Sequence, residues 1–398
     1  MELVIVATLL KIKGRIVFEN EVKTNHFVYI EDGKIAAVGP LAEAEGKYRD
    51  ADVFEIQESE TVVPGFIDLH IHGAAGADTM DGTHEALGTI AGALPAEGTT
   101  AFLATTITQE HGNIEQALKN AASYCEADNG PGKAEVVGIH LEGPFINAKR
   151  AGAQPREYII DPDIDLFKHW QSSAAGLIKL VTTAPELENG TKFIEYLAGT
   201  GVVASIGHTD AVYEEVEKAV KAGAKHVTHL YNGMRGMHHR EPGTAGAALL
   251  FKELLVEMIV DGIHIAPEMV KLSVSAKGPE GMVLVTDSMR AKCLNAGVYD
   301  LGGQDVTVGD GRAVLADGTL AGSILKMNEA VRNAADFSGI SLLDAVRMAS
   351  VNPARQIGIF DTKGSIAPGK DADLVVLDAG MNVKATWCRG VLTHQKGN

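Results

Sequence analysis

The alternation of apolar runs with helical stretches between residues 62 and 288 restricts this chain to few folds. Continuous runs rich in Val, Ile and Leu are typical of strands in a parallel sheet that is covered on both faces. Helical patterns separate most of these runs. The eight predicted strands are 62–70, 98–106, 134–143, 177–186, 202–209, 226–232, 254–264 and 282–288. Eight such βα units predict a (β/α)8 TIM-type barrel of about 250 residues.

The two ends of the chain have a different character. Residues 1–57 contain short strand-like runs, with Asp32-Gly33 placed as a hairpin turn, and residues 359–398 contain strands interrupted by Gly and Pro. Chain termini often lie close together. We therefore expect 1–57 and 359–398 to form one small composite β-sandwich domain, with the catalytic barrel over 58–358.

Charge and cysteine content narrow the possible partners. The formal net charge is -17, whereas nucleic acids and anionic membranes require a basic face. Cys125, Cys293 and Cys388 are far apart and form no CxxC pair, so we expect neither a disulfide framework nor a thiolate zinc site. No run approaches the ~20 apolar residues of a membrane span, and the apolar start at 3–10 lacks a preceding basic segment. These features predict a cytoplasmic protein.

Polar residues occupy the carboxyl ends of the predicted strands. Active sites of (β/α)8 barrels are built at that end of the barrel. Different strands deliver His and carboxylate residues there, and a barrel brings them together. The candidates are His70, His72, Glu142, His208, His229, Asp261, His264 and Asp287.

This residue set predicts a metal site. Imidazole and carboxylate ligands suit zinc or iron, and a catalytic site needs about three protein ligands with one position left open. Glu142, His208 and His229 provide that set. His70 and His72 stand at i and i+2 of a strand and point the same way. They either add a second cation that shares Glu142 as a bridge or complete a single site.

Asp287 follows the apolar run MVLVT and is placed to act as a general base toward an activated water. A plainer interpretation is that it caps a helix beside Ser288. Two other histidines have structural interpretations. His140 shares a strand face with Glu142 and should lie in the barrel interior, and His226 should face away from His229.

Several motifs together resemble the N-acetylglucosamine-6-phosphate deacetylases of the amidohydrolase superfamily. The resemblance extends from PGFID at 64–68 to GKDADLVVLD at 369–378. The motifs that carry it are HLEGPFI (140–146), SIGHTDA (205–211), THLYNGM (228–234), REPG (240–243), DGIH (261–264), VTDSM (285–289) and LAGSILKMNEAVRN (320–333).

The resemblance implies metal-dependent hydrolysis of N-acetyl-D-glucosamine 6-phosphate to D-glucosamine 6-phosphate and acetate. It implies Glu142, His208 and His229 as principal metal ligands and Asp287 as acid and base. The His-x-His pair implies a variant that holds up to two divalent cations. The residues implied to hold the substrate are Ala153, Gln154, Asn232, Gly233, Arg240, His264, Leu320, Ala321 and Gly322.

The resemblance also implies a homodimer in which Arg240 serves the site of the neighbouring subunit. Its Gly-flanked loop suits a guanidinium that reaches outward to a phosphate. His264 could polarise the acetamide carbonyl together with the metal. Gln154 stands where the family often has His, so its own contact is left open.

Two other functions remain possible on the sequence alone. A cyclic-amide hydrolase of the same superfamily, such as a hydantoinase or dihydroorotase, bridges two metals through a carboxylated lysine at the fourth strand. Here that strand ends in TTAPE at 182–186, and Glu142 offers the bridge instead. The chain could also be a non-catalytic regulator that binds a sugar phosphate, although it keeps both the ligands and the candidate base.

Overall fold

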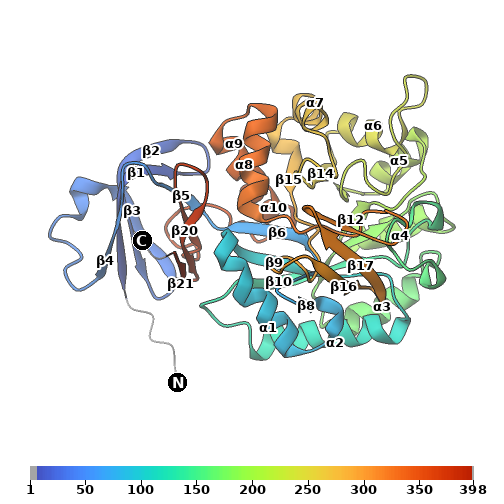
Figure 1. Ribbon diagram of the computed structural model, residues 1–398, viewed down its shortest axis with the longest axis horizontal. Coiled ribbons are helices and arrows are strands. Elements are labelled where there is room, and N and C mark those ends of the chain that lie inside the picture. Colours follow the sequence, from blue (N-terminus) through green and yellow to red (C-terminus); the bar gives the residue numbers. More distant parts are fainter. Residues whose placement is uncertain (1–6, 397–398) are drawn as a thin grey trace.

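The computed structural model describes residues 7–396 and has two parts (Figure 1). A barrel of parallel strands surrounded by helices lies on the right of the view, and a β-rich part built from both chain ends lies on the left. The predicted fold class, a (β/α)8 barrel with a second β domain, is confirmed. The first residues of the strand run expected at 3–10 lie outside the described range.

The barrel sheet has the strand order β15-β14-β13-β12-β11-β10-β9-β6, and every neighbouring pair in it is parallel. A parallel bridge between Ile71 and Ser288 joins the two outer ends of this sheet. The eight strands are β6 (Phe66–Ile71), β9 (Thr99–Thr106), β10 (Glu135–Glu142), β11 (Ile178–Thr183), β12 (Val203–Ile206), β13 (His226–Val227), β14 (Leu255–Met258) and β15 (Met282–Leu284).

Helices cover the outside of this sheet, and their apolar faces join the strands in one large core. Within residues 7–396, no helix has the length and apolar character needed to cross a membrane. The helices are α1 (His84–Ala93), α2 (His111–Ala127), α3 (Ile164–Ser173), α4 (Gly190–Gly199), α5 (Tyr213–Lys221), α6 (Gly243–Leu250), α7 (Pro267–Lys277), α8 (Met327–Ser338), α9 (Leu342–Ala349) and α10 (Val351–Gln356). Short 3₁₀ turns occur at η1 (Leu41–Ala44), η2 (Thr79–Asp81), η3 (Leu94–Glu97), η4 (Ala148–Arg150), η5 (Arg156–Tyr158) and η6 (Pro279–Gly281).

The second sheet combines strands from both ends of the chain in the order β21-β20-β19-β5-β1-β2-β3, with β4 beside β1. Its own apolar core contains Ile12, Val28 and Trp387. The exact domain boundaries remain a prediction. The strands are β1 (Thr8–Val17), β2 (Val22–Glu31), β3 (Lys34–Pro40), β4 (Asp52–Ile56), β5 (Thr61–Pro64), β19 (Leu374–Leu377), β20 (Val383–Cys388) and β21 (Val391–Gln395).

The single strand predicted over 62–70 was wrong, because the chain divides there between the two sheets. β5 pairs with β1 and β19 in the end-built sheet, and β6 pairs with β9 in the barrel. Gly65 lies at the division. A Cβ added to it would stand 2.0 Å from Thr100 Oγ1, so only glycine fits where the chain crosses from one sheet to the other.

The predicted insertion at 290–322 contains a three-stranded antiparallel sheet of β16 (Gly297–Leu301), β17 (Gln304–Gly309) and β18 (Arg312–Val314). Leu301 and Val306 pack in a small apolar cluster with Ile107 and Met289. The insertion therefore folds against segments that follow barrel strands. A further two-stranded hairpin, β7 (Gly73–Ala74) with β8 (Ala77–Asp78), follows the first barrel strand.

Candidate active site

Six polar side chains predicted from the strand ends meet at one end of the barrel. Three of them, Glu142, His208 and His229, form one cluster of potential ligand atoms, and His70, His72 and Asp287 form another. Within each cluster the ligand atoms lie within 4.8 Å of one another. Both clusters adjoin a cavity of about 240 Å³. The geometry thus brings together every metal ligand that the sequence predicted.

Glu142 stands between the two clusters and is 2% exposed. Its Oε1 lies 3.1 Å from His208 Nε2 and 3.1 Å from His229 Nε2. Its Oε2 lies 3.2 Å from His72 Nε2, on the other side of the carboxylate. Oε1 also lies 3.5 Å from His70 Nε2, so one carboxylate contacts histidines of both clusters, and Oε2 faces His72.

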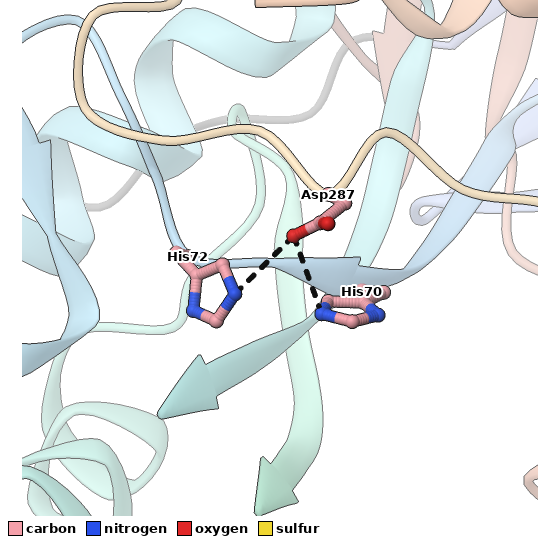
Figure 2. Close-up of side chains that lie close together, drawn as sticks. All are labelled: His70, His72 and Asp287. Carbon is pink, nitrogen blue, oxygen red and sulfur yellow. Dashed lines mark ion pairs between the residues drawn. The ribbon is translucent and has the colours of Figure 1, made fainter. Parts of the chain in front are cut away.

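The second cluster joins β6 to the segment after β15 (Figure 2). Asp287 Oδ1 lies 3.4 Å from His70 Nε2 and 3.3 Å from His72 Nε2. The main-chain N–H of Asp287 donates to the carbonyl of His70 at 2.8 Å. This bond fixes the carboxylate over the His-x-His pair. No helix of the described chain begins at Asp287, so the helix-cap interpretation is wrong.

The backbone explains why several predicted strands end earlier than expected. His208, His229 and Asp287 have φ values of 45°, 29° and 47°, in the left-handed region that costs free energy for residues other than glycine. Extended structure cannot continue through them, so β12, β13 and β15 end before these residues. Backbone strain of this kind is concentrated at functional sites.

Hydrogen bonds on the far ring nitrogens set the direction of three imidazoles. The Nδ1 atoms of His208 and His229 lie 2.8 Å from the Arg150 carbonyl and 3.1 Å from the Asn232 carbonyl. His70 Nδ1 lies 3.0 Å from Glu257 Oε2. A partner on Nδ1 turns Nε2 toward the centre of the site and raises its strength as a ligand.

Glu257 is a site residue that the sequence prediction missed. It is fully buried on β14, where its carboxylate also accepts the main-chain N–H of His229 at 3.1 Å. The available signal was a lone carboxylate inside the apolar run LLVEMIV. A buried charge of this kind needs a specific partner.

The ionisable side chains in the two clusters shift one another's pKa. Burial alone would raise the pKa of Glu142, but His70, His208 and His229 outweigh it and hold that pKa well below its usual range. Burial alone would lower the pKa of His72, yet hydrogen bonds to Asp287 and Glu142 raise it to about 9. A cation that binds here must therefore displace protons.

His264 also lines the cavity, and Asp261 holds it in place. The Nδ1 atom of His264 lies 2.7 Å from Asp261 Oδ2, and the same carboxylate accepts the main-chain N–H of His264 at 2.8 Å. These contacts leave the other ring nitrogen available to a ligand. The sequence prediction put both residues at the end of the strand 254–264, whereas β14 ends at Met258 and both lie in the segment that follows it.

The predicted substrate residues are only partly gathered at the cavity. Ala321 is fully buried and does not line it. Arg240 is exposed, does not line the cavity, and places Nη1 2.7 Å from His239 Nε2. Those that line the cavity are Ala153, Gln154, Asn232, Gly233, His264, Leu320 and Gly322.

The structural roles predicted for two histidines are confirmed. His140 is buried, and its Nε2 lies 2.8 Å from Thr182 Oγ1. His226 is buried, and its Nε2 lies 3.0 Å from Glu257 Oε1. Both rings are committed to protein partners away from the cavity.

Comparison with known proteins agrees with this geometry. Residues 61–393 match the amidohydrolase family. The chain belongs to this family. An N-acetylglucosamine-6-phosphate deacetylase from Bacillus subtilis (strain 168) is 51% identical to this amidohydrolase over 376 residues, 94% of each chain. An N-acetylgalactosamine-6-phosphate deacetylase from Escherichia coli O157:H7 is 37% identical over 92% of this chain and 94% of the relative.

A solved structure supports the same family assignment. The N-acetyl-D-glucosamine-6-phosphate deacetylase of Mycobacterium smegmatis, as a mutant in complex with N-acetyl-D-glucosamine-6-phosphate, superposes with a TM-score of 0.90 at 33% identity. The match covers 98% of this chain and 99% of that one. The family resemblance predicted from the sequence is confirmed, and this amidohydrolase is an amide-hydrolysing enzyme of the deacetylase type.

Proposed function

We propose that this amidohydrolase converts N-acetyl-D-glucosamine 6-phosphate and water to D-glucosamine 6-phosphate and acetate. The observation that carries the proposal is the convergence of Glu142, His208 and His229 beside Asp287 in one cavity. The names of its relatives, all deacetylases of N-acetyl-hexosamine 6-phosphates, support this substrate class.

The donor sets fit divalent cations, with zinc or iron as the best match to imidazole and carboxylate ligands. The buried Nε2 of His70 finds no hydrogen-bond partner within residues 7–396 and lies 3.4 Å from Asp287 and 3.5 Å from Glu142. We assign one cation to Glu142, His208 and His229 and a second to His70, His72 and Glu142. When bound, a cation supplies Lewis acidity toward the acetamide oxygen and lowers the pKa of water.

Asp287 moves the protons in this mechanism. Its Oδ1 takes one proton from the attacking water as the new C–O bond forms at the acetyl carbon. The same carboxyl then delivers that proton to the amine nitrogen as the C–N bond breaks. Acetic acid and the free amine are formed and Asp287 is again a carboxylate, so it acts first as base and then as acid; transfer of the acetic acid proton to the amine gives acetate and the protonated amine.

His264 binds and orients the substrate. Asp261 fixes the imidazole from behind, so the free ring nitrogen can contact the acetamide oxygen or a neighbouring sugar hydroxyl. An imidazole whose Nδ1 is held by a carboxylate that also accepts the main-chain N–H of the same residue loses little further rotational freedom when the substrate binds. Asn232, Gly233, Leu320 and Gly322 form the remaining wall for the sugar.

The phosphate requires a cation that the cavity of one subunit lacks. Among the described residues that line the cavity, none is Lys or Arg. The exposed Arg240 lies on a loop closed by a bridge between His238 and Glu241. We assign the phosphate contact to Arg240 of the partner subunit in a homodimer, with Ala321 supporting the wall formed by its neighbours.

We place the reaction in the cytoplasm, where a phosphorylated sugar would be retained. The three cysteines are free, which fits a reducing compartment.

Acetate release tests the proposal. The purified enzyme, supplied with zinc or iron, is offered N-acetylglucosamine 6-phosphate, N-acetylgalactosamine 6-phosphate, hydantoin and dihydroorotate. We expect equimolar acetate and free amine from the first substrate. Hydrolysis of a cyclic amide without acetate release from either sugar phosphate would establish the cyclic-amide hydrolase instead. Binding of the sugar phosphate without any turnover would establish the regulator.

A further inference from the structure

Both polar atoms of the Gln154 side chain are engaged by the protein. Its Oε1 accepts the main-chain N–H of Thr108 at 2.8 Å, and its Nε2 donates to Glu142 Oε2 at 2.8 Å. The residue is only 5% exposed. An N–H group cannot donate to the amide nitrogen, so Thr108 fixes which end of the amide faces Glu142. The direction of this donor is therefore set by the backbone after β9.

The contact acts on one oxygen of Glu142 only. Oε2 accepts from Gln154 and faces His72 at 3.2 Å, while Oε1 faces His208 and His229 at 3.1 Å each and His70 at 3.5 Å. A carboxylate on a flexible side chain can otherwise rotate about its last bond and give both oxygens to one cation. A donor anchored on Oε2 holds that oxygen toward His72 and leaves Oε1 toward His208 and His229.

We propose that Gln154 is a positioning residue that keeps Glu142 in the bridging orientation and thereby sets the affinity of the His70 and His72 side for its cation. The proposal rests on the metal-dependent function proposed above and deepens it. This positioning role takes the place of the substrate contact that the sequence predicted for Gln154. The Oε1 and one N–H of the Gln154 amide are engaged inside the protein, so its hydrogen bonds support a role in orienting Glu142.

The loop that carries Gln154 has independent supports, which provide a control. The main-chain N–H of Gln154 donates to the Ala151 carbonyl at 2.9 Å. Gln304 on β17 donates its Nε2 to the Ala153 carbonyl at 2.6 Å. Gln304 thus holds the same loop through the same kind of amide but does not touch Glu142.

The test is a zinc titration of metal-free protein, without substrate, for wild type, Gln154→Leu and Gln304→Leu. We expect wild type to bind two cations and Gln154→Leu to bind the weaker one with about 10- to 100-fold lower affinity, the usual effect of losing a group that orients a ligand. The affinity for the other cation should change little, and a separate steady-state assay should show little change in the KM for the sugar phosphate. Gln304→Leu should bind both cations as wild type does.

Gln154→Asn provides a second test in case the leucine variant does not fold. It keeps the amide, but it is one methylene too short to span Thr108 and Glu142, so it should show the same selective loss. Unchanged affinity for both cations in a folded Gln154 variant, with a raised KM, would overturn the proposal and make Gln154 a substrate contact. A wild-type protein that binds one cation only would also overturn it. Because the titration contains no substrate, its result is separate from any failure of the substrate assignment.

Discussion

The Nε2 atoms of His208 and His229 lie 3.1 Å apart, and both point at the same oxygen of Glu142. A single proton can form only one of these three hydrogen bonds at a time. Lone pairs on the two Nε2 atoms and on the Glu142 oxygen therefore face one another. A divalent cation accepts all of them at once. This relationship is the main support within residues 7–396 for the proposed metal centre at the barrel end.

Asp287→Asn should fold and keep the cation assigned to Glu142, His208 and His229, yet lose most turnover. An amide cannot accept the proton of water, and removal of a general base typically lowers kcat by about 10²- to 10⁴-fold. Steady-state kinetics with metal content measured on the same sample checks this. A near-normal kcat at unchanged metal content would remove Asp287 from its assigned role.

Replacing both His70 and His72 with Ala should reduce the bound cations from two to one. Of the ligands assigned to the second cation only Glu142 then remains, beside Asp287, and carboxylates without an imidazole hold zinc or iron weakly. Elemental analysis after dialysis gives the stoichiometry. If the double variant binds as many cations as wild type, these histidines are not ligands.

Glu257→Gln should weaken metal binding although Glu257 is not itself a ligand. The substitution keeps the shape but places an N–H₂ group against a donor from His70, His226 or the His229 main chain. Loss of such an orienting partner typically costs 10- to 100-fold in metal affinity, so we expect about that reduction. Zinc titration reports it, and thermal unfolding of the same samples separates it from a loss of fold. Wild-type affinity in a folded variant would refute the role.

Mixing Arg240→Ala with Asp287→Asn should restore activity at low substrate concentration. In a mixed dimer, one site has its own Asp287 and Arg240 of the partner subunit, so random exchange should return about a quarter of the wild-type activity per site. Labelled subunits establish that exchange has occurred. No recovery after exchange would show that Arg240 serves its own subunit.

The sequence predicted the positions of the ligands better than their supports. His70, His72, Glu142 and Asp287 were predictable because parallel strands bring their carboxyl ends to one edge. Gln154 faces Glu142 because a main-chain donor from a different loop fixes its amide, and no spacing in the sequence encodes that contact. The contact between His208 Nδ1 and the Arg150 carbonyl could not be predicted either, because every residue type has a main-chain carbonyl.

The division of the strand predicted over 62–70 has another cause. Every residue from Thr61 to Ile71 is buried, so the apolar pattern is continuous across two sheets. In the sequence only the Pro64-Gly65 pair marks the change, and the predicted strand ran through this pair instead of ending at it. Pairing partners, rather than hydrophobicity, decide where one sheet ends and the other begins.

The most direct test of the central claim is acetate release from N-acetylglucosamine 6-phosphate during stepwise return of zinc or iron to metal-free wild-type protein. If Glu142, His208 and His229 hold the cation on which hydrolysis depends, acetate release should be absent at the start and rise in proportion to the first equivalents bound. A matched titration of Glu142→Gln should show little binding and little acetate. Full acetate release from the metal-free wild type would contradict the account.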